Sequence, residues 1–187
     1  LLAQREGFSC PLLEGVTGSG KTEVYLQLIA DCLERGLQAL VLIPEIGLTP
    51  QTLARFRDRF DAEIAVLHSG LSDGQRYTAW EAARSGTAHI VIGTRSAVFA
   101  ALARPGLIVV DEEHDQSYKQ QDGFRYSARD VAVKRGQLEN CPVLLGSATP
   151  SLESLHNALQ GRYVHHRLQQ RAGGSQLPKL EAVDIRK

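Results

Sequence analysis

The chain has 187 residues, 43% of them apolar and 22% charged, and a formal net charge of zero, which is the composition of a globular domain with a substantial core. No apolar run reaches the roughly 18 residues of a membrane span, and the first residues lack a signal-peptide pattern. A net charge of zero does not by itself indicate nucleic-acid binding, but it does not exclude a local basic groove.

Three separated cysteines, Cys10, Cys32 and Cys141, show no CxxC spacing. This argues against a zinc site or a disulfide framework, favours a reducing cytoplasm, and leaves the cysteines as plain core or surface residues. The chain has no methionine, even at position 1, so we expect it to be a fragment of a longer protein.

Short apolar runs alternate with longer stretches of helical period along the chain. The predicted strands are 11–14, 39–43, 64–68, 89–93, 107–111 and 143–147. The predicted helices are 21–35, 50–60, 73–85, 96–102, 127–138 and 151–160. Repeated strand–helix–strand units indicate an α/β three-layer sandwich around a mainly parallel sheet.

Local signals place several helix ends. Thr49 with Pro50 is typical of an N-cap and first-turn proline, Ser72 with Gln75 has capping-box spacing, and Gly36 follows a predicted helix.

The pattern of strands and helices fades towards the end of the chain. We assign residues 1–166 to one domain and 167–187 to a linker and the start of a following region. The polar segment 169–179 is typical of a linker, and 180–185 is a candidate strand of whatever follows.

The sequence GVTGSGKT, residues 15–22, follows a predicted strand and opens a predicted helix. It fits the phosphate-binding pattern GxxxxGK[ST], in which glycines let backbone N–H groups turn towards phosphate oxygens. Lys21 would reach the β- and γ-phosphates, and the Thr22 hydroxyl would bind Mg²⁺. The predicted nucleotide-binding residues are Gly15, Gly18, Ser19, Gly20, Lys21, Thr22 and Glu23.

The sequence LIVVDEEH, residues 107–114, ends an apolar strand in three acids and a histidine. Ligands of doubly wound sheets sit at the carboxyl ends of strands, so Asp111 would come beside the phosphates and share Mg²⁺ with Thr22. Glu112 is suited to orient an attacking water, which counts against a metabolic kinase. His114 is a catalytic candidate, with an exposed histidine beside acids as the alternative.

Four further stretches decide the class of protein: IPEIGLTPQ (43–51), IGTRSAVF (92–99), DEEHDQSYKQQDGFRYSARD (111–130) and GSAT (146–149). With the phosphate loop, they resemble superfamily 2 helicases. The DEEH form, PEIGLTPQ and the aromatic-rich run are similar to the replication-restart helicases of that superfamily. The resemblance covers nearly the whole chain and implies the first motor lobe, with a RecA-like P-loop NTPase fold.

The resemblance implies roles for individual residues. Lys21, Asp111, Glu112 and His114 fall in the hydrolytic motifs, and Ser147 and Thr149 in the motif that couples hydrolysis to movement. Segments that contact single-stranded DNA contain Glu45, Thr49, Gln51, Thr94 and Arg95.

An aromatic-rich stretch after DEEH resembles a loop that senses DNA. Aromatic faces can stack on bases while cations meet phosphates, with ordinary packing of the aromatics beneath a surface loop as the alternative. Its candidate DNA contacts are Tyr118, Lys119, Phe124, Arg125, Tyr126 and Arg129.

The family also implies cofactors and partners. We expect ATP and Mg²⁺ in this lobe, and zinc in the parent family but not in this segment. Single-stranded and forked DNA, other primosome proteins and a single-stranded-DNA-binding protein are the implied partners, with no membrane. The implied setting is the bacterial cytoplasm, associated with the nucleoid. The implied activity is 3′-to-5′ unwinding at stalled forks.

Parts of such a motor are absent from the sequence. The second lobe with its arginine fingers is missing, and Gln4 lies too close to the phosphate loop for the adenine-reading glutamine. An arginine finger is worth about 10³-fold or more in rate, so we expect the isolated lobe to be nearly inactive.

Two alternatives stay open. A double-stranded DNA translocase shares the nucleotide motifs but leaves the aromatic stretch unexplained, and a fork-binding scaffold could use ATP as a switch.

Among the remaining residues, His165 and His166 point to opposite faces of a strand and are expected to have no function. Trp80 is expected to pack within its helix.

Overall fold

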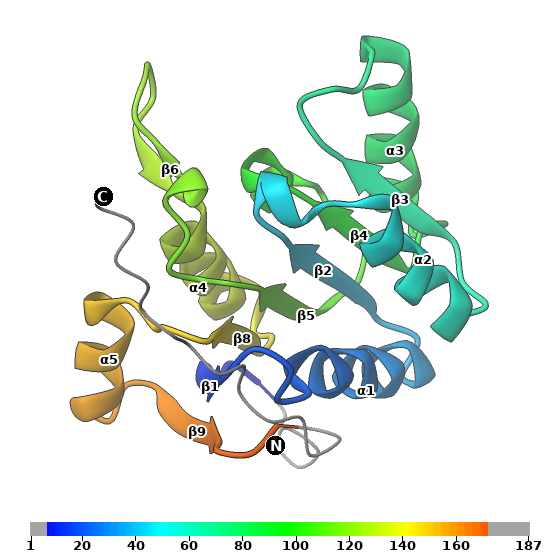
Figure 1. Cartoon of the computed structure of the whole chain (residues 1–187). Coiled ribbons are helices and arrows are strands. Elements are labelled where there is room, and N and C mark those ends of the chain that lie inside the picture. The colour runs from blue at the N-terminus through cyan, green and yellow to red at the C-terminus, as the bar shows by residue number, and fades with distance from the viewer. Residues whose placement is uncertain (1–6, 172–187) are drawn as a thin grey trace, which may run out of the picture.

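The computed structural model describes residues 7–171, which form a seven-stranded parallel sheet with helices on both faces (Figure 1). The strands lie in the order β3-β4-β2-β5-β8-β1-β9. Their bounds are β1 Pro11–Gly15, β2 Gln38–Leu42, β3 Ile64–Leu67, β4 Ile90–Gly93, β5 Pro105–Val110, β8 Val143–Ser147 and β9 Val164–Leu168. Apart from the sheet, β6 (Lys119–Gln120) and β7 (Tyr126–Ser127) form a short antiparallel hairpin.

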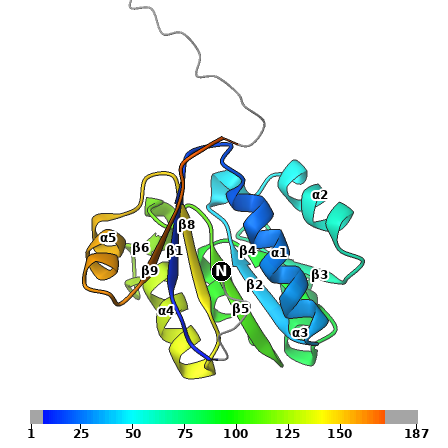
Figure 2. The same ribbon diagram turned by 90° about the horizontal axis from the view of Figure 1, so that it is seen from below.

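Helices cover the sheet in two layers, which Figure 2 shows from below. Helices α1 (Lys21–Glu34) and α2 (Pro50–Arg59) pack on one face, and α3 (Asp73–Ser85), α4 (Ala128–Glu139) and α5 (Leu152–Leu159) pack on the other. Successive strand residues supply the two cores in alternation: Leu12 belongs to one and Leu13 to the other. Strands buried on both faces explain the continuous apolar runs in the sequence.

The predicted α/β sandwich is therefore confirmed, and so are the helix-end signals. Thr49 caps α2 by accepting a hydrogen bond from the Thr52 N–H at 3.2 Å, and Ser72 and Gln75 form a capping box at α3. Gly36 follows α1 in the left-handed region at φ 69°.

Two segments differ from the sequence-based assignment. The helix predicted over 96–102 is a short 3₁₀ turn, η2 (Arg95–Phe99), and similar turns η1 (Glu45–Gly47) and η3 (Gln116–Tyr118) follow other strands. Strand β9 was not predicted, because only its two end residues are apolar. The candidate strand 180–185 lies outside the described residues.

Strand β9 pairs with the full length of β1 and so borders the phosphate loop. Across this pair, the His165 ring lies 2.8 Å from the Glu14 carboxylate, which Arg167 also contacts at 2.9 Å. His165 thus has a structural partner in the sheet. None of the helices in residues 7–171 is both long and apolar enough to cross a membrane.

Candidate nucleotide and nucleic-acid site

The phosphate loop joins β1 to α1 at the carboxyl edge of the sheet. Gly18 and Gly20 adopt left-handed conformations at φ 80° and 92°, which glycine reaches without strain. Among residues 7–171, no side chain caps α1, which leaves its first N–H groups free to meet an anion. The buried Ser19 hydroxyl has no hydrogen-bond partner within the described residues. Such uncommitted donors fit a phosphate group.

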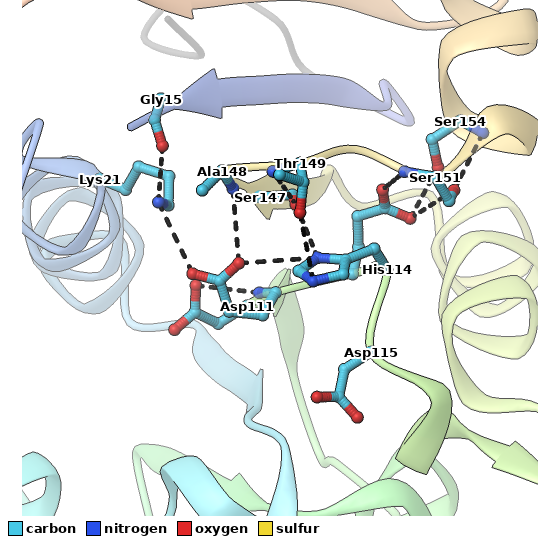
Figure 3. A network of polar contacts seen from close by, with 12 residues as sticks. Gly15, Lys21, Asp111, His114, Asp115, Ser147, Ala148, Thr149, Ser151 and Ser154 are labelled. Carbon is cyan, nitrogen blue, oxygen red and sulfur yellow. Dashed lines mark hydrogen bonds and ion pairs between the residues drawn. The ribbon is translucent and has the colours of Figure 1, made fainter. Parts of the chain in front are cut away.

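Lys21 connects the phosphate loop to the acidic strand end. Its ammonium group donates to the Gly15 carbonyl at 2.8 Å and lies 3.6 Å from the Glu112 carboxylate (Figure 3). The residue is 8% exposed, so its charge is held inside the site by these two partners.

Asp111 sits at the end of β5 and is held by two tyrosines. The Tyr25 hydroxyl donates to its carboxylate at 3.0 Å, and the Tyr118 hydroxyl donates to its carbonyl at 2.8 Å. Burial, followed by the negative charge of Glu112, raises the pKa of the Asp111 carboxyl. Asp111 and Thr22 border one hollow of about 260 Å³, and their oxygens are of the kind that Mg²⁺ prefers.

Glu112 is held in a conformation that non-glycine residues seldom adopt, with φ at 45°. The Asp111 carboxylate accepts from its N–H at 3.0 Å, and its own carboxylate accepts from the Ala148 N–H at 3.4 Å. Backbone strain of this kind clusters at functional sites, where the surroundings hold it in place.

His114 joins the DEEH sequence to the GSAT sequence. Its Nδ1 lies 2.8 Å from the Ser147 hydroxyl and its Nε2 lies 3.3 Å from the Thr149 hydroxyl. The Thr149 N–H donates to Ser147 Oγ at 2.9 Å, which closes the connection. Nδ1 is also 3.7 Å from the Glu112 carboxylate, so His114 lies between Glu112 and the GSAT segment.

Glu113 is a site residue that the sequence analysis did not single out. Its carboxylate is buried and accepts from the Ser151 N–H at 2.7 Å and from the Ser154 hydroxyl at 2.8 Å. It also pairs with Arg129 at 3.2 Å. These partners are 16 to 41 residues away in the chain, so no local pattern reveals them.

The segments expected to contact DNA follow β2 and β4 at the same edge of the sheet. Glu45 and Gln51 are exposed, Thr49 is half-buried at its cap position, and Thr94 is only 7% exposed. The Arg95 guanidinium donates to the carbonyls of Ser117 at 3.2 Å and Lys119 at 3.3 Å, which ties η2 to the root of the hairpin.

The aromatic-rich stretch divides into a buried root and an exposed tip. Lys119, Phe124 and Arg125 are exposed and Tyr126 is half-buried, so these four can meet a strand of DNA. The expectation that Tyr118 stacks on bases is corrected: the residue is 1% exposed, because its ring packs in the core beneath Asp111.

Arg129 also needs a correction. It is 7% exposed, and its guanidinium is taken up by Glu113 at 3.2 Å and Asp130 at 2.8 Å. A cation already paired inside the protein is not available to a DNA phosphate. In the described part of the chain, no group of three or more His, Cys, Asp or Glu residues is arranged to hold a metal ion.

Comparisons with known proteins show the family and support the fold. Residues 5–158 match the family model "DEAD/DEAH box helicase", so the chain belongs to the DEAD/DEAH box helicases. In structure it is similar to RecG bound to a three-way DNA junction, with a TM-score of 0.64 and 24% identity over 89% of this chain and 21% of that one. The Pyrococcus furiosus Hef helicase domain gives a TM-score of 0.64 at 21% identity over 91% of this chain and 37% of that one. These two likenesses support the fold.

Individual relatives are more similar to this chain in sequence than the two solved structures are. The replication restart protein PriA of Haemophilus influenzae is 57% identical over 96% of this chain and 25% of its own length. PriA of Bacillus subtilis is 49% identical over 94% of this chain and 22% of its own length. The chain thus spans about a quarter of the relatives it matches. The predicted resemblance to the replication-restart helicases is confirmed.

Proposed function

We propose that this chain is the ATP-binding first lobe of a DNA motor that separates strands in the 3′-to-5′ direction at stalled replication forks. The observation that carries the proposal is the convergence of three motifs at one edge of the sheet. Lys21 lies 3.6 Å from Glu112, and His114 joins the same acidic loop to Ser147 at 2.8 Å. The similarity to proteins named for replication restart supports the setting at forks.

Nucleotide binding would rearrange this edge. Lys21, Thr22 and the first N–H groups of α1 would hold phosphate oxygens, and Asp111 and Thr22 are the residues that would hold Mg²⁺. The triphosphate with Mg²⁺ supplies a phosphoryl group whose charge is partly neutralised. Once Lys21 turns to phosphate, Glu112 loses its ion-pair partner and is free to orient water.

The hairpin would report DNA to this site. Phe124, Arg125 and Tyr126 meet the strand, while Tyr118 at the hairpin root donates to the Asp111 carbonyl at 2.8 Å. DNA that moves the hairpin therefore acts on the backbone of the Mg²⁺-binding residue. The partners proposed for the longer protein are forked DNA, other primosome proteins and a single-stranded-DNA-binding protein, in the bacterial cytoplasm at the nucleoid.

The first test measures nucleotide binding by the chain itself. A fluorescent ATP analogue with Mg²⁺ should bind weakly, and Lys21→Ala should remove that binding because the phosphates lose their main cation. Hydrolysis by the chain alone should be very slow. Strong DNA-stimulated turnover without a second lobe would contradict this part of the proposal.

The second test places the chain in a motor. This chain would replace the matching segment of the Haemophilus influenzae relative, and the parent relative would serve as the control. Forked DNA should stimulate hydrolysis, Glu112→Gln should lower the stimulated rate by about 10² or more, and a 3′ tail should be needed for unwinding.

The alternatives give different results in the same assay. Preference for blunt duplex over forked DNA would indicate a double-stranded DNA translocase. Strand separation that persists in Lys21→Ala would indicate a scaffold switched by ATP, because a motor loses unwinding with its phosphate-binding lysine.

A further inference from the structure

A second hollow, of about 720 Å³, lies between α3 and η2 and is separate from the nucleotide site. Its size falls within the roughly 300–1,000 Å³ of small-ligand sites. Three large aromatic side chains border it and remain exposed: Tyr77 at 64%, Trp80 at 38% and Phe99 at 54%. Aromatic side chains gathered around one hollow and left open to solvent make it a candidate binding site.

The exposed rings continue from this hollow to the hairpin. The ring centroids of Tyr77 and Trp80 are 6.4 Å apart on α3. On the other side, the Phe99 ring packs edge-on against Tyr126 at 5.0 Å, and Tyr126 lies 6.1 Å from Phe124 at the hairpin tip. Phe99 therefore belongs both to the hollow and to the aromatic cluster proposed to meet DNA.

The hollow has polar side chains on its border, among them one cation that can meet a phosphate. Arg76, His68 and Ser69 border it together with one acid, Asp73. Outside the hollow, the Arg84 guanidinium lies 5.4 Å from the centre of the Trp80 ring, a cation–π contact that holds the indole in place.

The position of the hollow also continues the proposed DNA path. Ser69, on its rim, donates to the Glu45 carboxylate, and η2, which forms one wall, begins with Arg95. Helix α3 and the β6–β7 hairpin both lie towards the top of Figure 1. A strand running over η1 and η2 would pass the mouth of the hollow.

We propose that this hollow is a base-binding subsite for single-stranded nucleic acid, in which a base stacks against Trp80 and Phe99 while the adjoining phosphates face Arg76. The inference rests on the proposed function, because it names where on this lobe the strand is gripped. It also revises the expectation that Trp80 only packs within its helix.

The chain carries its own probe for this site, since Trp80 is its single tryptophan. A dye-labelled deoxythymidine oligonucleotide would be titrated into the chain while dye anisotropy reports binding and indole fluorescence reports stacking. An abasic oligonucleotide of the same length keeps the phosphates and removes the bases. We expect the base-bearing strand to quench Trp80 and the abasic strand to leave its emission unchanged.

Two variants complete the test. Phe99→Ala should weaken binding of the base-bearing strand roughly tenfold, as expected for one stacked base, and should leave binding of the abasic strand unchanged. Leu138→Ala, which removes an apolar side chain 75% exposed on α4, is the matched control and should change neither.

Several outcomes would overturn the inference. Anisotropy that rises without quenching, or equal quenching by both strands, would show that bases do not enter the hollow, while DNA binding by the lobe would stand. If neither strand binds, the hollow is not a nucleic-acid subsite and a protein becomes the occupant to seek. The proposed function would then still be decided by hydrolysis and unwinding in the motor assay.

Discussion

Replacing Glu113 with glutamine tests whether a buried carboxylate holds the acidic loop to the segment after GSAT. The substitution keeps the size of the side chain and removes its charge. Glu113 accepts from the Ser151 N–H on one oxygen, and from Arg129 and the hydroxyls of Ser151 and Ser154 on the other. An amide nitrogen in either position would face an N–H donor, so one hydrogen bond must be lost whichever way the amide turns.

The magnitude follows from these contacts. A hydrogen bond to a charged acceptor contributes about 1.5–3 kcal/mol, and a buried charge left without its partner costs about 3–5 kcal/mol. Arg129 keeps Asp130 at 2.8 Å after the change, so its charge stays partly compensated. We therefore expect Glu113→Gln to lower the free energy of unfolding by about 2–4 kcal/mol.

Urea unfolding followed by far-ultraviolet circular dichroism would measure this loss. Glu153→Gln is the matched control, because its carboxylate is 59% exposed and 3.8 Å from the same guanidinium, and it should cost less than about 0.5 kcal/mol. The double variant Glu113→Gln with Arg129→Met should depart from additivity by about 1 kcal/mol or more. Equal effects of the two glutamine variants, or simple additivity, would refute the reasoning.

Three further predictions concern other buried groups. Tyr118→Phe should cost about 1 kcal/mol in urea unfolding and Tyr118→Ala about 3–5 kcal/mol, whereas a base-stacking surface residue would show little change in either variant. Asp111→Asn should raise the free energy of unfolding at pH 7 without Mg²⁺, because burial and the charge of Glu112 raise the pKa of the Asp111 carboxyl in the folded state. Below the ordinary pKa of 3.8 the carboxyl is protonated in both the folded and the unfolded chain, so the gain should vanish there. A gain in stability that persists below that pH would contradict the prediction. Burial raises the pKa of the thiols of Cys10 and Cys32 to about 12 and that of Cys141 to about 11. Iodoacetamide at pH 8 should therefore label these cysteines only when urea unfolds the chain, which mass spectrometry would measure. Rapid labelling of the folded chain would count against the prediction.

Much of the nucleotide site could be predicted because its signals are local. The pattern GVTGSGKT is contiguous, and an apolar strand ending in DEEH specifies which side chains leave the carboxyl edge of the sheet. Strand β9 escaped prediction because VHHRL has only two apolar residues and owes its conformation to pairing with β1. Its strand conformation comes from backbone hydrogen bonds to a distant segment, which side-chain periodicity does not encode.

The aromatic-rich stretch shows where composition misleads. Tyr118 and Phe124 are both aromatic residues next to cations in the sequence, yet Tyr118 is 1% exposed and Phe124 is 81% exposed. Arg125 and Arg129 likewise differ only in what surrounds them, since Arg129 lies in the first turn of α4 and faces Glu113. Trp80 packs within its helix as expected, beside Tyr77 and Arg84, and it also borders an open hollow.

The sequence by itself determined the alternation of strands and helices, the helix caps and the motifs proposed to hold phosphate and Mg²⁺, because each depends on residues within about one turn or one strand of one another. Tertiary structure alone decided which side chains of the same type are buried in the core and which are exposed and available to a ligand. Glu113 is buried and bonded to Ser154, and Phe99 contacts both the hairpin and the hollow beside α3. The surroundings of these two residues come from elements many residues apart in the chain.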